Sequence, residues 1–357
     1  MNIINALAAV DFHVEFPGLG IEGDKALKIS RTAFSIGNFS IRWYGIIIAL
    51  GMLLCFILAM NACKKEGISK DDLVDYLILG IPLGIIGARL YYVIFNFKDY
   101  KENFWDVFKI WEGGLAIYGG VIMAVISVLI MSRIKKHKFL MVLDFALPYI
   151  MLGQGIGRWG NFFNQEAFGG YTTLPWGMTS ENVQADKYIQ NQMAELKVQG
   201  TPVAHPTFFY ESVLCLIGFA LLLVYRSKLR RSYGECTCLY MIYYGSFRFF
   251  IEGLRTDSLY IGNTDIRVSQ VVSAAMVVIG IALFIDLRIR YAKGKKAEAA
   301  AAEPEAVPET GFAGVVAKIA EMDKEEEEIR TINESKKVTT DNLETDEEKE
   351  ETEKEDK

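Results

Sequence analysis

The sequence has few of the side chains that build metal centres or disulfide frameworks. Its 357 residues include three histidines and five cysteines. Cys63, Cys236 and Cys238 fall at the ends of apolar runs and Cys55 and Cys215 within them, so we expect small buried side chains rather than disulfide partners. Cys236 and Cys238 also lack the second cysteine pair or the histidines of a zinc site. No metal site and no cofactor are predicted.

Signals for nucleic acid binding and for a cleaved leader are also missing. The charged C-terminal segment has no basic groove with interleaved aromatic residues, so nucleic acid is not an expected partner. The first ten residues contain an apolar patch without a positively charged region or a cleavage-like site, so no signal peptide is predicted. Residues 1–38 are expected to form an external N-terminal segment.

Hydrophobic residues are abundant and make up 51% of the chain. Three runs carry no charged side chain, and at about 1.5 Å per residue each covers roughly 27 to 31 Å, enough to cross a bilayer core. Four further runs are interrupted but similar in length. We therefore predict an all-α polytopic membrane protein with about seven transmembrane helices, over residues 43–63, 76–97, 113–132, 140–157, 207–225, 236–254 and 268–285.

Lysine and arginine are concentrated in alternate connections between these runs, and such an excess marks the cytoplasmic side. This pattern predicts an external N-terminus and a cytoplasmic C-terminus. Residues 39–290 then form the membrane domain, with an external loop at 158–206. Residues 291–357 hold 11 basic and 21 acidic residues and offer no buried face, which predicts a mostly disordered cytoplasmic tail.

The end of the fourth run combines glycine with polar side chains. Residues 153–170 contain six glycines together with Arg158, Asn161, Asn164 and Glu166. At the rim of a bilayer, glycine permits close approach, and polar side chains supply charge and hydrogen bonds where water is scarce. We interpret this segment as the floor of a membrane site. The alternative is a helix end that these residues merely stabilise.

Five ionisable side chains from four runs are expected at a similar depth. Counting from the cytoplasmic ends at about 1.5 Å per residue places four of them about 20 to 23 Å up a core roughly 30 Å thick, and Glu252 one turn above Arg248. Charges inside a membrane face a cavity or one another, so these favour one polar chamber open to the outside. Alternatively, Arg89 and Arg158 extend to the outer headgroups, and the pair of Arg248 and Glu252 only stabilises one helix. The five are Arg89, Arg158, Glu211, Arg248 and Glu252, and Tyr44 begins the first run at the same end.

Arginine is the common element of this chamber. Arg158, Arg248 and Arg255 favour a phosphate ligand, because planar guanidinium groups bind phosphate oxygens through two hydrogen bonds. Phospholipid is the phosphate available at that depth. A transporter more often shows internal repeats around the midplane, and the sequence has no convincing repeat.

Together these motifs closely resemble the prolipoprotein diacylglyceryl transferases of the bacterial cytoplasmic membrane. The family signature Gly-Arg-x-Gly-Asn-Phe-x-Asn-x-Glu-x-x-Gly is matched at each defined position, and the similarity covers residues 12–290. The matching residues are Gly157, Arg158, Gly160, Asn161, Phe162, Asn164, Glu166 and Gly169, with further blocks at Arg42-Trp43-Tyr44-Gly45, Gly87-Ala88-Arg89, Trp111-Glu112-Gly113-Gly114, His205-Pro206-Thr207, Tyr210-Glu211, Phe247-Arg248-Phe249, Glu252 and Arg255.

The resemblance implies transfer of the diacylglyceryl group from phosphatidylglycerol to the lipobox cysteine thiol of an exported prolipoprotein. This forms a thioether, releases glycerol phosphate and begins lipoprotein maturation. The implied enzyme spans the bacterial cytoplasmic (inner) membrane, with its active site towards the outer leaflet, and its oligomeric state is left open. The expected catalytic residues are Arg158, Asn161, Glu166, Arg248, Glu252, Tyr44 and Tyr118, and those expected to bind phosphatidylglycerol are Arg158, Arg248, Arg255, Arg89, Gly169, Asn164 and His205.

Tyr118 departs from the family pattern, in which many members carry a histidine just before the second double glycine of the third run. Tyrosine, with an ordinary pKa of about 10, is a poor base near neutral pH. Glu166, Glu252 or His205 could take the thiol proton instead. We favour a fourth possibility, in which the arginine charges lower the pKa of the substrate thiol and no strong base is needed.

Two other functions fit part of the pattern. A binding or transport protein for an anionic lipid or solute would also use an arginine-lined chamber. A phosphatidyltransferase of the CDP-alcohol type would need an aspartate cluster for a divalent metal, and the predicted spans have none. Formation of a thioether-linked peptide distinguishes the transferase from both.

Overall fold

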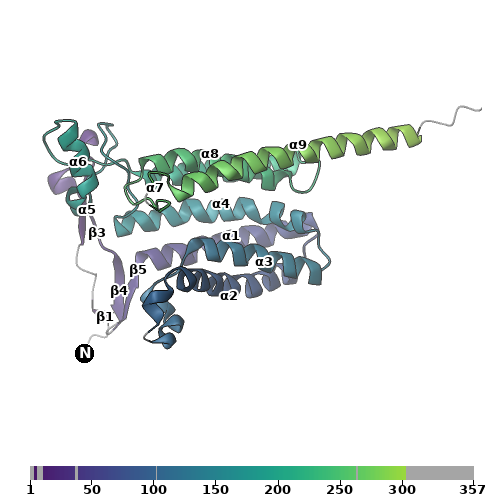
Figure 1. The fold of residues 1–357 in the computed structure, drawn as a ribbon, viewed down its shortest axis with the longest axis horizontal. Helices are drawn as coiled ribbons and strands as arrows, with labels where there is room; N and C mark the ends of the chain where they lie inside the picture. The colour runs from purple at the N-terminus through teal and green to yellow at the C-terminus, as the bar shows by residue number, and fades with distance from the viewer. Residues whose placement is uncertain (1–3, 6–10, 37–38, 102, 263, 303–357) are drawn as a thin grey trace, which may run out of the picture. The chain divides into compact units, whose positions relative to one another are not determined.

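The structure is a computed structural model that describes residues 4–5, 11–36, 39–101, 103–262 and 264–302, and these are mostly helical (Figure 1). Each of the seven predicted runs overlaps a long helix. Six of these helices have the length and composition to cross a membrane, and α8 does not meet that criterion. The long helices are α1 (Trp43–Ala62), α2 (Lys70–Phe95), α3 (Ile117–Ile134), α4 (Phe139–Asn164), α7 (Thr207–Lys228), α8 (Glu235–Leu254) and α9 (Val268–Ala302).

Helix α4 is central to the packing of the unit formed by residues 1–292. It packs against α1, α7 and α8, while α2 packs against α3. The long helices run side by side in Figure 1. Large side chains such as Phe145, Tyr149 and Met151 on α4 are buried between its neighbours. Because α4 contacts several other long helices, residues on its faces can meet side chains from several spans.

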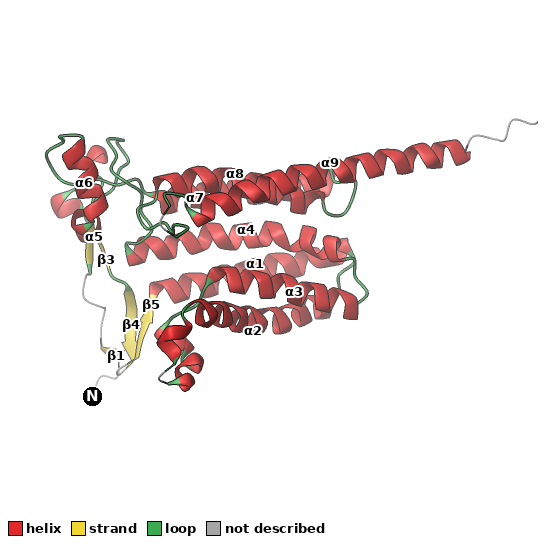
Figure 2. Ribbon diagram, viewed as in Figure 1, coloured by secondary structure: helices red, strands yellow, loops and turns green. Residues whose placement is uncertain are grey.

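Short strands precede α1, but the described chain is mostly helical, which is consistent with the predicted all-α polytopic membrane protein (Figure 2). In one sheet β4 (Thr32–Ile36) pairs antiparallel with β1 (Ile4–Asn5) and β5 (Phe39–Arg42), and in another β2 (Phe12–Val14) pairs with β3 (Leu27–Ile29). Strands β1, β2 and β3 have only two or three residues, too few for the alternating pattern that identifies a strand in a sequence.

The connection between α4 and α7 packs against the segment that holds β2. It contains α5 (Glu181–Ala185) and α6 (Lys187–Glu195), which present Val183 and Ile189 to Phe12 and Val14 in a small apolar core. The backbone of Glu15 pairs with that of Thr179. This layer therefore fixes the end of α4 that carries the polar signature.

Short 3₁₀ turns complete the connections. They cover Pro17–Leu19, Gly23–Lys25, Cys63–Glu66, Phe97–Tyr100, Phe104–Phe108 and Ile110–Glu112. The last three join α2 to α3 and expose aromatic side chains, among them Trp105 and Trp111, which are 74% and 76% exposed. Aromatic residues at the end of membrane helices are typical of the bilayer interface.

Several predicted boundaries move, and α3, for example, begins at Ile117 rather than at residue 113. Helix α4 continues to Asn164 and ends where Gln165 adopts a left-handed backbone with φ 48°, so residues 158–164 of the loop predicted at 158–206 are helical. Helix α9 continues to Ala302, so the first part of the predicted tail is also helical. The predicted disorder of residues 303–357 lies outside the described residues.

Candidate functional site

Three helices contribute to a buried cluster of four charged side chains, which we call the arginine cluster. Glu211 on α7 forms ion pairs with Arg158 on α4, at 2.5 Å from Nη2, and with Arg248 on α8, at 2.7 Å from Nη1. The other terminal nitrogen of Arg248 donates to Glu252 one turn further along α8. The cluster thus contains four of the five charges predicted to share one depth.

Burial makes these pairings necessary. The side chains of Glu211 and Glu252 are 2% and 3% exposed, and a buried carboxylate without a partner is strongly destabilising. Arg158 is 20% exposed, more than either carboxylate. A guanidinium held at one corner by Glu211 can therefore present its remaining N–H groups to a ligand at the end of α4.

The polar side chains of the signature meet just beyond the helix end. The side-chain amides of Asn161 and Asn164 donate to Oε1 of Glu166, at 3.1 and 3.0 Å. The N–H of Glu166 donates to the carbonyl of Asn161 at 3.1 Å. Because Glu166 is exposed while its amide partners are half-buried, this arrangement both closes the helix end and faces outward.

Two glycines of the signature sit where a side chain would collide. A Cβ on Gly160 would lie 2.5 Å from the ring of Tyr44, so the missing side chain lets α1 bring that ring against α4. A Cβ on Gly169 would lie 2.8 Å from Cβ of His205. Both approaches position residues predicted for the site, Tyr44 and His205, against the signature segment.

Backbone pairing joins Gly169 to the segments after α8 and before α7. Its N–H donates to the carbonyl of His205 at 2.9 Å, and the N–H of Gly170 donates to the carbonyl of Leu254 at 2.7 Å. Gly169 also forms a bridge with Arg255. Three predicted site residues, Gly169, His205 and Arg255, therefore belong to one connected region.

His205 is a neutral hydrogen-bonding group in this region. Its Nδ1 lies 3.3 Å from Tyr210 Oη, which accepts a hydrogen bond from Trp176 at 2.8 Å. Burial lowers the pKa of His205 below its ordinary value, because loss of contact with water destabilises the imidazolium cation more than the neutral ring. A neutral ring at pH 7 keeps one nitrogen able to accept a proton.

Arg255 pairs with an aspartate that the sequence did not single out. Asp257 accepts from Nε at 2.8 Å and from Nη2 at 2.7 Å. Burial opposes ionisation of Asp257, but the hydrogen bonds and charge of Arg255 outweigh it and lower the pKa of the carboxyl. The spacing Arg-x-Asp is the one signal that could have indicated this pair.

Arg89 lies apart from these pairings in the described contacts. Its guanidinium donates to five backbone carbonyls, those of Asp106, Val107, Lys109, Gly113 and Gly114, at 2.6 to 3.4 Å. All five belong to the connection between α2 and α3. The structure thus supports a role for Arg89 in holding this connection, and phosphatidylglycerol binding by Arg89 stays a prediction without a described contact behind it.

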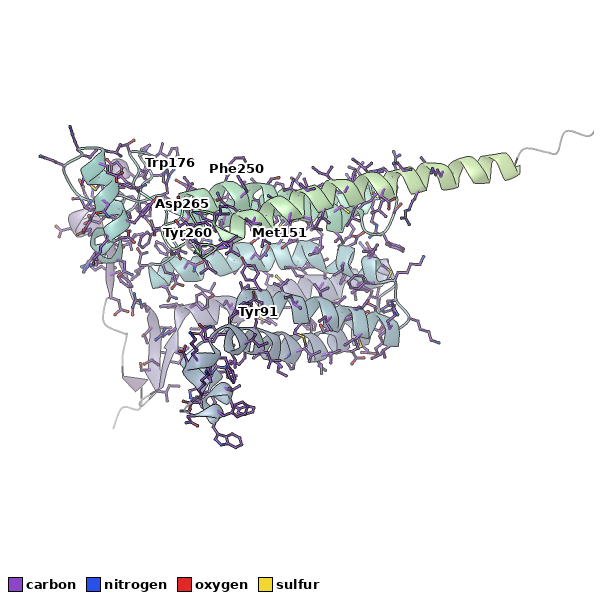
Figure 3. The ribbon with its side chains drawn as sticks, viewed as in Figure 1. Tyr91, Met151, Trp176, Phe250, Tyr260 and Asp265 are labelled. Atoms are coloured by element: carbon purple, nitrogen blue, oxygen red, sulfur yellow. The ribbon has the colours of Figure 1, made fainter. Side chains whose placement is uncertain are left out.

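Tyr118 also lies outside the arginine cluster. Its hydroxyl is 3.4 Å from Ser269 Oγ on α9, and its ring is 6.3 Å from that of Tyr91 on α2, labelled in Figure 3. The side chain is half-buried between three helices.

Among the described residues, no group of three or more histidine, cysteine, aspartate or glutamate side chains is arranged to hold a metal ion.

Comparisons with known proteins agree on one family. Its sequence model, described as prolipoprotein diacylglyceryl transferase, matches residues 31–286. Proteins named phosphatidylglycerol–prolipoprotein diacylglyceryl transferase are similar to this chain: one from Finegoldia magna is 46% identical over 266 residues, which cover 74% of this chain and 97% of the relative. Another from Thermotoga maritima is 43% identical over 73% of this chain and 86% of the relative. One from Listeria welshimeri is 43% identical over 75% and 93%.

The matched region includes the whole arginine cluster and the polar end of α4. The extent of this match, together with relatives above 40% identity over most of their own length, shows that the chain belongs to the prolipoprotein diacylglyceryl transferase family.

Proposed function

We propose that this chain transfers the diacylglyceryl group of phosphatidylglycerol to the cysteine thiol of a prolipoprotein. The names of its relatives indicate this activity for those proteins. The observation that carries the proposal is the pairing of Arg158 and Arg248 through Glu211. This pairing puts two guanidinium groups near the family signature. They would bind the phosphate of the donor lipid.

The reaction forms one bond and breaks another. The thiolate sulfur of the substrate cysteine attacks the glyceryl carbon that carries the phosphate, and the carbon–oxygen bond breaks as the carbon–sulfur bond forms. The departing oxygen leaves with the electron pair as part of glycerol phosphate, and the thiol proton is released. Negative charge therefore grows on the phosphate, where guanidinium groups stabilise it best.

The remaining site residues have proposed positioning roles. Asn161, Asn164 and Glu166 would hold the lipid headgroup or the thiol at the end of α4, with Gly169 keeping that approach open. Tyr44 would line the same region from the start of α1. Glu166, Glu252 and the neutral His205 stay open as proton acceptors, beside the alternative that the arginine charges lower the pKa of the thiol enough by themselves.

The same proposal includes the arrangement in the membrane. Helix α8 would be the seventh span, since it packs against α4 and α7 and its charges pair within the bundle rather than facing lipid. The excess of lysine and arginine in alternate connections favours an external N-terminus. The arginine cluster, near the start of α7 and the end of α8, would then face the outer leaflet of the bacterial cytoplasmic membrane.

The test is a product assay with the purified full chain in liposomes containing phosphatidylglycerol. A lipobox peptide should gain a thioether-linked diacylglyceryl group, with one glycerol phosphate released per modified peptide. A peptide with serine in place of the cysteine is the matched control and should stay unmodified. Binding of phosphatidylglycerol without product would instead support a lipid-binding or transport protein.

A further inference from the structure

Arg255 differs from the other arginines of the site in the kind of carboxylate that it holds. Asp257 accepts from Nε and Nη2 at 2.8 and 2.7 Å, the two-point geometry in which arginine also binds phosphate. The side chain of Arg255 is 13% exposed, whereas that of Asp257 is 48% exposed. A largely buried guanidinium is thus paired with a carboxylate that water reaches.

Arg255 acts within the same electrostatic field as the arginine cluster. It follows α8 directly, its N–H donates to the carbonyl of Glu252 at 3.3 Å, and its backbone bridges to Gly169. Burial opposes its charge, but Asp257, Glu211 and Glu252 together raise the pKa of Arg255 above its ordinary value. A phosphate that reaches Arg158 and Arg248 would therefore also be drawn to Arg255.

An incoming phosphate must compete with carboxylates for guanidinium N–H groups. Glu211 and Glu252 cannot move into water without rebuilding the contact between α7 and α8, because their side chains are 2% and 3% exposed and lie inside helices. Asp257 lies in the connection between α8 and α9 and is already half in water. Of these three carboxylates, Asp257 is the one that can leave its arginine at small cost.

We infer that Asp257 is a displaceable counter-ion, which holds the guanidinium of Arg255 in its phosphate-binding orientation until the phosphate of the lipid replaces it. Asp257 is a positioning residue and takes no part in bond breaking. The inference rests on the proposed function, because it concerns how the same site receives its anionic headgroup. It explains why a site built for an anion keeps a carboxylate at its edge: a buried arginine without a partner would destabilise the empty protein.

The inference predicts the direction of one measurement. In Asp257→Asn the competitor loses its charge and keeps its shape, so the KM for phosphatidylglycerol in liposomes should fall about three- to tenfold, with kcat changing less than KM. Glycerol phosphate should also inhibit at a lower concentration. If Asp257 only oriented Arg255, its loss would raise KM. An unchanged or raised KM therefore overturns the inference.

The connection between α8 and α9 offers a matched control. Asp265 is exposed, lies in the same connection and is labelled in Figure 3 beside Tyr260. Asp265→Asn removes the same charge, and its KM should equal that of the unchanged protein. An equal fall of KM in Asp265→Asn would show a general effect of net charge and would contradict displacement at Arg255.

A second readout separates this inference from the transfer activity. The amount of phosphatidylglycerol that copurifies with each variant, measured by lipid extraction, should be larger for Asp257→Asn than for the unchanged protein or Asp265→Asn. If the unchanged protein makes no thioether product but this order holds, the proposed function fails and the counter-ion role stands. If Asp257→Asn does not fold, Asp257→Ser tests the same loss of charge. If neither variant folds while Asp265→Asn does, the ion pair of Asp257 with Arg255 is required for folding and the inference is wrong.

Discussion

Two buried charged clusters occupy opposite ends of α7 and α8, and in the second of them carboxylates bind backbone N–H groups as well as guanidinium groups. In the arginine cluster, the described contacts of the Glu211 and Glu252 carboxylates are with guanidinium groups. At the other end, Asp144 accepts from the backbone N–H groups of Gly234 and Thr237 at 2.7 and 2.8 Å. The second arrangement closes the start of α8, as an N-cap does.

The second cluster, which we call the capping cluster, binds connections as well as helices. Glu235 accepts from Tyr225 at 2.8 Å and from the N–H of Arg231 at 3.0 Å. Glu66, after α1, pairs with Arg230 at 2.6 Å. Its members are Glu66, Asp144, Arg226, Arg230, Glu235 and Arg288.

The difference between the clusters indicates which one can exchange partners. If a buried backbone N–H loses the carboxylate that it donates to, it stays without an acceptor, and this costs free energy. A guanidinium can replace a carboxylate with a phosphate of similar geometry. Buried charge alone therefore does not identify a site, and the partners of that charge do.

The largest expected effect comes from replacing Arg158, the most exposed member of the arginine cluster. Arg158→Ala should lower the rate of thioether formation by at least two to three orders of magnitude, because it removes donors from the developing phosphate charge. Arg158→Lys keeps the charge but cannot donate two parallel hydrogen bonds to a phosphate, so it should retain a small part of the activity. Near-normal turnover of a folded Arg158→Ala would show that the two clusters are alike in function.

The order of two effects inside the arginine cluster comes next. Glu252→Gln should weaken activity less than Arg248→Ala, since Glu252 orients Arg248 while Arg248 is proposed to bind the phosphate. Both variants are compared by kcat/KM at equal folded fraction. The reverse order would assign proton transfer to Glu252.

Tyr118 provides a smaller effect. Tyr118→Phe removes the hydroxyl near Ser269 and should cost at most one to two orders of magnitude in rate, about the low end of general acid–base assistance. Ser269→Ala removes the partner and serves as the control for a purely structural hydrogen bond. A loss of about four orders in a well-folded protein would make the tyrosine itself catalytic.

For the capping cluster we expect a change in stability with little change in activity. Asp144→Ala should lower the free energy of unfolding by about 1 to 3 kcal/mol, because the first N–H groups of α8 lose their acceptor. The midpoint of thermal unfolding should fall by several degrees, while thioether formation per folded molecule stays within about threefold. A large loss of turnover in the folded fraction would mean that both clusters serve the reaction.

The smallest effect concerns the C-terminal segment. A truncation after Lys296 should leave transfer unchanged, because the removed residues lie outside the matched family region. The truncated and full chains would be compared in the same liposomes. A truncated protein that inserts and folds without activity would contradict this expectation.

Several features of the site could be predicted because they are local. The polar end of α4, the glycines and the pair of Arg248 and Glu252 at i, i+4 all follow from spacing along one helix. Arg89 shows the limit of this reasoning. Its depth along α2 was a fair expectation, but depth does not give direction around the helix axis, and the carbonyls that it binds come from a connection 17 to 25 residues further along.

The sequence by itself determined the long helices, because a run of apolar residues long enough to cross a bilayer forms its backbone hydrogen bonds within the segment. It also determined the chemistry of the arginine cluster, since the cost of buried charge requires partners within the bundle. The tertiary structure decided which partners these are. Glu211 joins Arg158 to Arg248 only because α7 packs beside α4 and α8. Such pairings depend on how helices rotate and connections fold, and spacing along one segment carries no information about either.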